Sequence, residues 1–145
     1  AVENTPDQGR IDIEVFEHSG RTAVAVRDSG VGIAPEDQGR IFEGLSPLQE
    51  ALTYSTKKPF DFGAGGKCLD LLRIKIFSEQ LGFTVSIRSE RCIHLAKGRV
   101  ESCPGKVDAC PACEGAQDCL ESGGTVLTLT FAGSAGHGPA SPDPE

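Results

Sequence analysis

The sequence lacks several features that would assign it to a class at once. No apolar run approaches the roughly 20 residues that a membrane-spanning helix needs, and no signal-peptide pattern is visible. Positive charge is scarce, since 14 lysines and arginines face 21 aspartates and glutamates for a net charge of −7. Nucleic-acid binding needs clustered basic residues, so we expect no nucleic-acid partner and no membrane contact from this segment.

The remaining composition is that of one soluble globular domain. The 145 residues are 38% hydrophobic and 24% charged, which is ordinary for a chain that buries a core. The sequence starts abruptly at Ala1, and we interpret it as a fragment of a longer chain. Six cysteines without an export signal favour metal or redox chemistry over a disulfide framework.

Hydrophobic periodicity and turn residues predict an α+β fold. We expect a two-layer α/β sandwich, in which a mixed, mostly antiparallel sheet carries its helices on one face. Residues 44–66 have no sustained period, which is typical of a functional lid, and the Gly- and Pro-rich tail over 132–145 should be disordered. Strands are predicted over 11–15, 22–28, 83–88 and 125–131, and helices over 35–42 and 67–81.

The most informative motif is Asp28-x-Gly30-x-Gly32, which follows the apolar, β-branched run 22–26. A strand that ends in this pattern places one carboxylate at the lip of a cleft. There the carboxylate can accept a hydrogen bond from an exocyclic amine such as that of adenine. The two glycines let the backbone turn sharply and approach a flat ligand closely. Taken alone, the pattern is equally typical of a plain hairpin turn.

Three further motifs follow in a fixed order. Phe42 lies in an Ile-Phe-Glu tripeptide before the lid, the run Gly63-Ala64-Gly65-Gly66 opens the long helix, and Thr125 opens the last strand. Together the motifs resemble the ATP-binding catalytic domain of sensor histidine kinases, in the GHKL superfamily of gyrase, Hsp90 and MutL. The resemblance covers residues 1–131, apart from a cysteine-rich insert over 90–122. It implies a Bergerat-type ATP-binding fold that is truncated at its N-terminus.

The resemblance gives each matching residue a role. Asp28 would bind the adenine amine, and the backbone N–H groups of the glycine run would form an anion site for phosphates at the helix N-terminus. Each motif also has a plain reading: Phe42 as a core residue, the glycine run as a hinge, and Thr125 as an ordinary strand residue. The implied nucleotide-binding residues are Asp28, Gly30, Gly32, Phe42, Gly63, Gly65, Gly66 and Thr125.

The sequence departs from the family in the half of the site that would hold phosphates. Residues 1–6 look like the end of the box whose asparagine binds Mg²⁺ in relatives, so the metal-holding residue and the catalytic acid would precede Ala1. Glu3 stands where many relatives have a phosphate-contacting lysine, and Cys68 and Asp70 replace small residues of the second glycine box. We therefore assign no catalytic residue within this chain.

The implied function is that of the ATP-binding domain of a two-component sensor histidine kinase. With ATP and Mg²⁺, such a domain transfers the γ-phosphoryl group to a histidine in a dimerisation segment outside this chain, and a response regulator then receives it. His18, His94 and His137 are poor acceptors, so we expect the chain alone to have little or no autokinase activity. The alternative is a degenerate nucleotide-binding module that responds to metal or redox state. We expect a cytoplasmic domain, either by itself or as the soluble part of a membrane-anchored sensor.

The cysteine-rich insert is the part that the kinase resemblance does not explain. Cys110-x2-Cys113 has the knuckle spacing that tetrahedral zinc favours, and a loop so rich in Pro and Gly cannot order itself by burial. An iron–sulfur cluster, two disulfides or redox-active free thiols are the alternatives, while Cys92 and His94 are reserve ligands. The predicted zinc ligands are Cys103, Cys110, Cys113 and Cys119.

Overall fold

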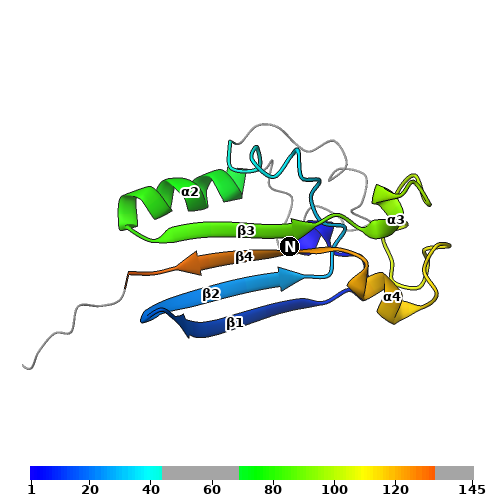
Figure 1. The fold of residues 1–145 in the computed structure, drawn as a ribbon, viewed down its shortest axis with the longest axis horizontal. Coiled ribbons are helices and arrows are strands. Elements are labelled where there is room, and N and C mark those ends of the chain that lie inside the picture. The colour runs from blue at the N-terminus through cyan, green and yellow to red at the C-terminus, as the bar shows by residue number, and fades with distance from the viewer. Residues whose placement is uncertain (44–68, 133–145) are drawn as a thin grey trace, which may run out of the picture.

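The computed structural model describes residues 1–43 and 69–132, and its central feature is a four-stranded sheet in the order β1-β2-β4-β3 (Figure 1). Each neighbouring pair of these strands is antiparallel, so the predicted α+β class with a mostly antiparallel sheet is confirmed. The strands are β1 Ile11–His18, β2 Arg21–Asp28, β3 Thr84–Glu90 and β4 Gly124–Thr130.

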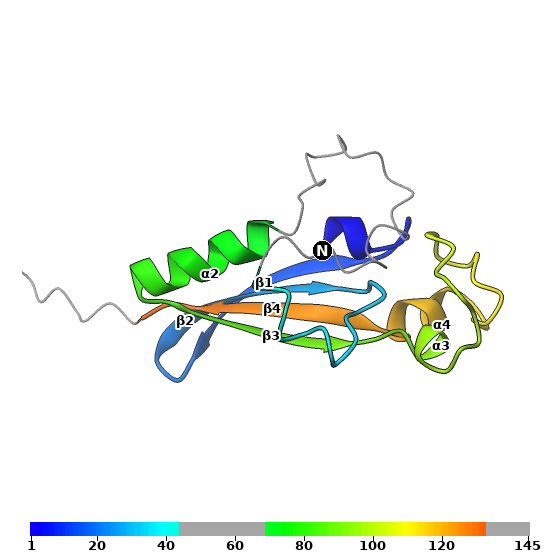
Figure 2. The same cartoon turned by 90° about the horizontal axis from the view of Figure 1, so that it is seen from above.

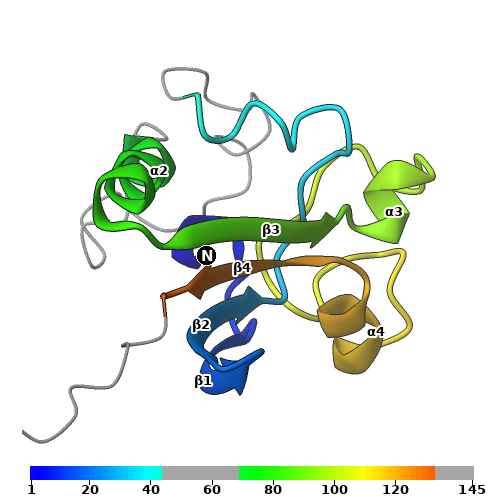
Figure 3. The same cartoon turned by 60° about the vertical axis from the view of Figure 1, so that its left-hand side comes forward.

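The helices divide between one face and one end of the sheet. Helix α2 Leu69–Leu81 lies across one face, and the 3-10 turn η1 Val2–Asn4 lies on the same side (Figure 2). Two short helices, α3 Ile93–Ala96 and α4 Ala116–Glu121, lie beyond the end of the sheet where β3 finishes and β4 begins (Figure 3). None of the helices in 1–43 and 69–132 is long and apolar enough to span a bilayer.

The β1–β2 hairpin fixes the register that places Asp28. Its two-residue turn has positive φ at both Ser19 (52°) and Gly20 (72°), the combination that matches the twist of paired strands. From this turn the ladder runs without interruption, so that Asp28 stands opposite Ile11 on β1 and Thr125 on β4. Asp28 therefore ends a central strand of the sheet.

Two local predictions are wrong. Residues 35–42 form consecutive turns instead of a helix, with i→i+3 bonds such as Arg40 N–H to Asp37 O at 2.9 Å, and Gly39 lies within them. The alternation of Ile11, Ile13 and Val15 with acidic residues predicts a half-buried first strand, yet Ile13 and Val15 are each 69% exposed. β1 is an edge strand, and no element within the described ranges covers these side chains.

Candidate nucleotide site

The Asp28 side chain is buried, with 8% exposure, at the end of β2. Side chains alternate between the faces of a sheet, and residues directly opposite one another share a face. Thr125 stands opposite Asp28, and Ser89 on β3 stands opposite Thr125. The three polar side chains thus form one row across the end of three strands.

The Asp28 carboxylate is held by backbone donors. The N–H of Gly30 donates to Oδ1 at 3.0 Å. Burial raises the pKa of Asp28 from its ordinary value of 3.8, and the backbone N–H groups of Gly30 and Thr125 oppose that rise. The result is a desolvated acceptor that is directed away from bulk solvent, as binding of an amine donor requires.

Gly30 and Gly32 have no room for a side chain, because other parts of the chain lie close to both residues. Gly32 has φ +66°, and a Cβ there would overlap the carbonyl oxygen of Glu90. A Cβ on Gly30 would lie 2.7 Å from Asp28 Oδ1. Larger residues at either position would displace the loop that holds the carboxylate.

Ser89 is a residue of this site that the sequence analysis missed. Its hydroxyl accepts from the Ile33 N–H at 2.8 Å, donates to the Gly124 carbonyl at 3.1 Å and lies 2.8 Å from Thr125 Oγ1. It thereby joins the loop after Asp28 to the start of β4. The sequence did contain a signal for Ser89: it continues the alternating positions of Val85 and Ile87, so a polar side chain stands where an inward-facing apolar one is expected.

The remaining predicted positions are less informative. Phe42 is half-buried within the turns that follow the Asp28 loop. Gly63, Gly65 and Gly66 lie outside the described residues, as do Cys68 and the proposed lid. An open hollow of about 590 Å³ lies at this end of the sheet. Asp28 and Thr125 line it, together with Arg27 and Arg88 from the opposite face of the sheet.

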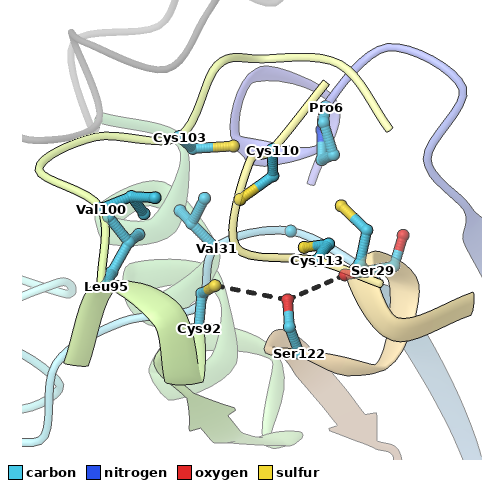
Figure 4. A pocket seen from close by; sticks show the side chains of 12 residues that line it. Pro6, Ser29, Val31, Cys92, Leu95, Val100, Cys103, Cys110, Cys113 and Ser122 are labelled. Atoms are coloured by element: carbon cyan, nitrogen blue, oxygen red, sulfur yellow. Dashed lines mark hydrogen bonds between the residues drawn. The ribbon is translucent and has the colours of Figure 1, made fainter. Parts of the chain in front are cut away.

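Beside the Asp28 loop, five cysteines line a single pocket (Figure 4). Ser29, Gly30 and Val31 form part of the same wall, which joins the cysteine-rich insert to the nucleotide motif. All five of these cysteines are free thiols, so the disulfide alternative is not realised among the described residues. They are Cys92, Cys103, Cys110, Cys113 and Cys119.

Burial raises the pKa of the thiols of Cys103, Cys113 and Cys119. Hydrogen bonds with Cys113 and with the backbone N–H of Asp108 oppose the rise in the pKa of Cys119, and the backbone N–H of Gly105 opposes it at Cys103. The charges of the neighbouring cysteines add to the rise in the pKa of both thiols. The thiols are therefore protonated and unreactive unless a cation compensates the charge of the thiolates.

A histidine adjoins this pocket. His94 is 2% exposed, and neither ring nitrogen has a hydrogen-bond partner. Its Nε2 lies 3.4 Å from Asp118 Oδ2, and the ligand atoms of His94, Cys113 and Asp118 all lie within 4.8 Å of one another. The described chain thus offers nitrogen, oxygen and sulfur donors at the edge of the thiol pocket.

Comparison with known proteins identifies the class. The family described as "Histidine kinase-, DNA gyrase B-, and HSP90-like ATPase" matches residues 1–132. The chain belongs to this ATPase family, and the resemblance inferred from the motifs is confirmed.

Individual relatives are sensor histidine kinases. RppB of Synechocystis sp. is 42% identical over 43 residues, which make up 30% of this chain and 10% of that protein. The mycobacterial kinase MprB aligns with a TM-score of 0.54 and 17% identity, over 90% of this chain and 63% of its own structure. Full-length ShkA in complex with AMPPNP gives a TM-score of 0.49 and 18% identity, over 90% of this chain and 19% of its own. The chain therefore spans less than two thirds of each relative.

Proposed function

We propose that this domain binds ATP and donates its γ-phosphoryl group to a histidine outside the chain, within a two-component sensor kinase. The buried Asp28 carboxylate carries the proposal, because its fixed position at the end of a central strand suits recognition of an exocyclic amine. Phosphoryl transfer depends mainly on positioning and electrostatics, so the contribution of this chain is to hold the nucleotide.

The other parts of the site have defined tasks in this proposal. Thr125 contacts the adenine end through water, Phe42 borders the pocket, and the backbone N–H groups of Gly63, Gly65 and Gly66 bind the phosphates. Magnesium enters with the nucleotide, and a residue outside this chain completes its coordination. A dimerisation segment supplies the acceptor histidine, and a response regulator then takes the phosphoryl group.

The chain alone should not phosphorylate itself. His18 ends β1 at the hairpin turn, and His94 is buried beside the thiol pocket, so neither offers an exposed imidazole on a helix pair. Incubation with labelled ATP and Mg²⁺ tests this expectation. Robust self-labelling of the 145-residue chain would contradict it.

Nucleotide titration tests the main proposal. Calorimetry with ADP and a non-hydrolysable ATP analogue should show binding that is weakened in Asp28→Asn and unchanged in Glu14→Gln, an exposed control on β1. The titration is made on this chain and on any longer natural form of the protein. Equal affinity in the wild type and Asp28→Asn would refute the assigned role of the carboxylate.

A second function is favoured by the position of the cysteines. The thiol pocket shares its wall with Ser29, Gly30 and Val31, so a change at the thiols reaches the loop that holds Asp28. A degenerate nucleotide module that responds to metal or redox state would use this contact without kinase activity. Binding of ATP analogues by the longer protein, without any transfer to histidine, would favour this function.

A further inference from the structure

The cysteine-rich insert is not needed to bind a nucleotide, yet it contains five of the six cysteines of the chain. We propose that Cys103, Cys110, Cys113 and Cys119 bind one zinc ion as thiolates. Zinc binding releases the four thiol protons to solvent and changes no oxidation state. The inference stands on the thiols alone and does not depend on whether the domain binds ATP.

The first argument is convergence. The four cysteines come from the loop between α3 and α4 and from α4 itself, yet all line one pocket. Figure 4 shows the sulfur atoms of Cys103, Cys110 and Cys113 directed into this shared space. Cys110 and Cys119 are each 8% exposed, so their thiols are removed from water without a disulfide bond. Unpaired thiols that gather in this way are typical of a thiolate metal site.

The second argument is the backbone around the sulfurs. The N–H groups of Gly105 and Asp108 donate to the sulfurs of Cys103 and Cys119. The Cys113 N–H donates to the Cys110 carbonyl at 3.2 Å, which closes the tight turn of the Cys-x2-Cys knuckle. Hydrogen bonds of this kind orient metal-bound thiolates and offset their negative charge.

Two nearby donors have other partners. The Cys92 sulfur lies 3.3 Å from Ser122 Oγ, which in turn donates to the Cys119 carbonyl at 2.8 Å. His94 does not line the pocket, and it faces Asp118 from beside Cys113. A thiolate at Cys113 would give the buried imidazole the acceptor that it lacks. We therefore place His94 in the support of the site and not among its ligands.

The third argument is that the insert has little else to hold it. Val107 is the one buried aliphatic residue among the described residues 91–123, and the loop 97–115 contains no helix or strand. Zinc bonds of about 2.3 Å would draw the sulfurs together, and this loop is free of regular structure that would resist the movement. Structural zinc supplies about 10–16 kcal/mol in small zinc-finger peptides, which is ample to order such a loop.

Metal analysis of the 145-residue chain, purified without added metal, tests the inference. We expect about one zinc per chain in the wild type, in Cys92→Ser and in His94→Asn. We expect zinc to be lost in Cys103→Ser and Cys110→Ser. Cobalt substitution gives a second readout, because the intensity of the thiolate-to-cobalt absorption reports the number of bound sulfurs even in a partly folded variant. Four thiolates are expected in the wild type.

Other outcomes would overturn the assignment. Iron with acid-labile sulfide and a brown colour would establish an iron–sulfur cluster. Zinc that survives Cys103→Ser but is lost in His94→Asn, with three thiolates in the cobalt spectrum, would establish a Cys3His site. If the protein contained no metal and all its thiols reacted with an alkylating agent, the cysteines would be packing residues and the zinc assignment would be wrong. A failed nucleotide titration would leave each of these results unchanged.

Discussion

The sheet and the cysteine insert are ordered by different physics. In the sheet, three uninterrupted antiparallel ladders satisfy the backbone, and small side chains such as Ala23 and Ala25 are buried on one of its faces. In the insert, the buried side chains include three cysteines and a histidine. Small thiols bury little apolar area, and a buried imidazole without a hydrogen-bond partner is unfavourable, so this interior by itself contributes little to the free energy of folding. With the proposed zinc site, the comparison predicts that the sheet folds by itself and that the insert depends on the metal.

Removing the metal should separate the two regions most clearly. A high-affinity zinc chelator is expected to lower hydrogen-exchange protection over residues 92–122 by about 100-fold, because metal binding there is folding free energy. The β1 and β2 amides, which are held by their own ladder, should change little. Unchanged protection of the insert after complete removal of zinc would contradict the comparison.

A substitution in the loop that joins the regions should have the next largest effect. Gly32→Ala forces a left-handed backbone and a contact with the Glu90 carbonyl, so it should lower the free energy of unfolding by about 3 kcal/mol. Gly39→Ala is the matched control, since its Cβ meets nothing within 4 Å. Denaturant unfolding measures the stability of both variants. Equal stabilities would contradict the prediction and show that the loop accommodates a side chain at position 32 without strain.

Asp28→Asn tests the sheet side of the comparison. Loss of a charge-assisted hydrogen bond of about 1.5–3 kcal/mol should weaken nucleotide binding by about 10- to 100-fold. The fold should survive, because the native protein holds a proton on this carboxyl more tightly than the unfolded chain does. That contribution to stability is present below pH 3.8 and declines as pH rises through the raised pKa, so Asp28→Asn should not destabilise the protein at pH 7.

Nucleotide affinity should follow the ionisation of the same group. It should be highest at neutral pH and decline in acid, beginning above pH 3.8, because the protonated carboxyl is a weaker acceptor. Titrations in a series of buffers measure this decline. Its disappearance in Asp28→Asn would assign the decline to this carboxyl.

A smaller effect would show that the two regions communicate. The Cys92 N–H donates to the Val31 carbonyl at 2.7 Å, which joins the insert to the loop after Asp28. The Asp7 N–H donates to the Gly105 carbonyl at 2.8 Å, which joins the insert to the N-terminal loop before β1. Zinc removal should therefore weaken nucleotide binding by about tenfold. The control is Cys110→Ser, in which the chelator should have no further effect. Full affinity after zinc removal would mean that the regions are independent.

The smallest expected effect concerns Ser89. Ser89→Ala removes the hydroxyl that links Ile33, Gly124 and Thr125, and should cost about 1 kcal/mol of stability, whereas exposed Ser86→Ala on the same strand should cost less than about 0.5 kcal/mol. Thermal unfolding distinguishes the two variants. Equal midpoints would show that water replaces the Ser89 hydroxyl.

The sequence predicted the parts of this domain that depend on local pattern. Alternation and glycine placement located the strands, and the motif after β2 located Asp28, because these signals come from backbone geometry. Ser89 was missed because its partners lie 35 and more residues away in the chain. The exposure of Ile13 was missed because alternation shows which face is apolar and not whether another element covers it. For the insert, cysteine spacing suggested the four ligands, which stay a prediction, while the wall that the thiol pocket shares with Gly30 is visible only in the structure.

The two ends of the insert meet each other. The Ile93 N–H donates to the Ser122 carbonyl at 2.8 Å, and the β3–β4 ladder is intact up to the pair Glu90 and Gly124. The strand pairing therefore depends little on how many residues lie between those ends, because the entropic cost of closing a loop grows slowly with its length. Replacement of the insert by a short turn should therefore leave every strand of the sheet in its present register.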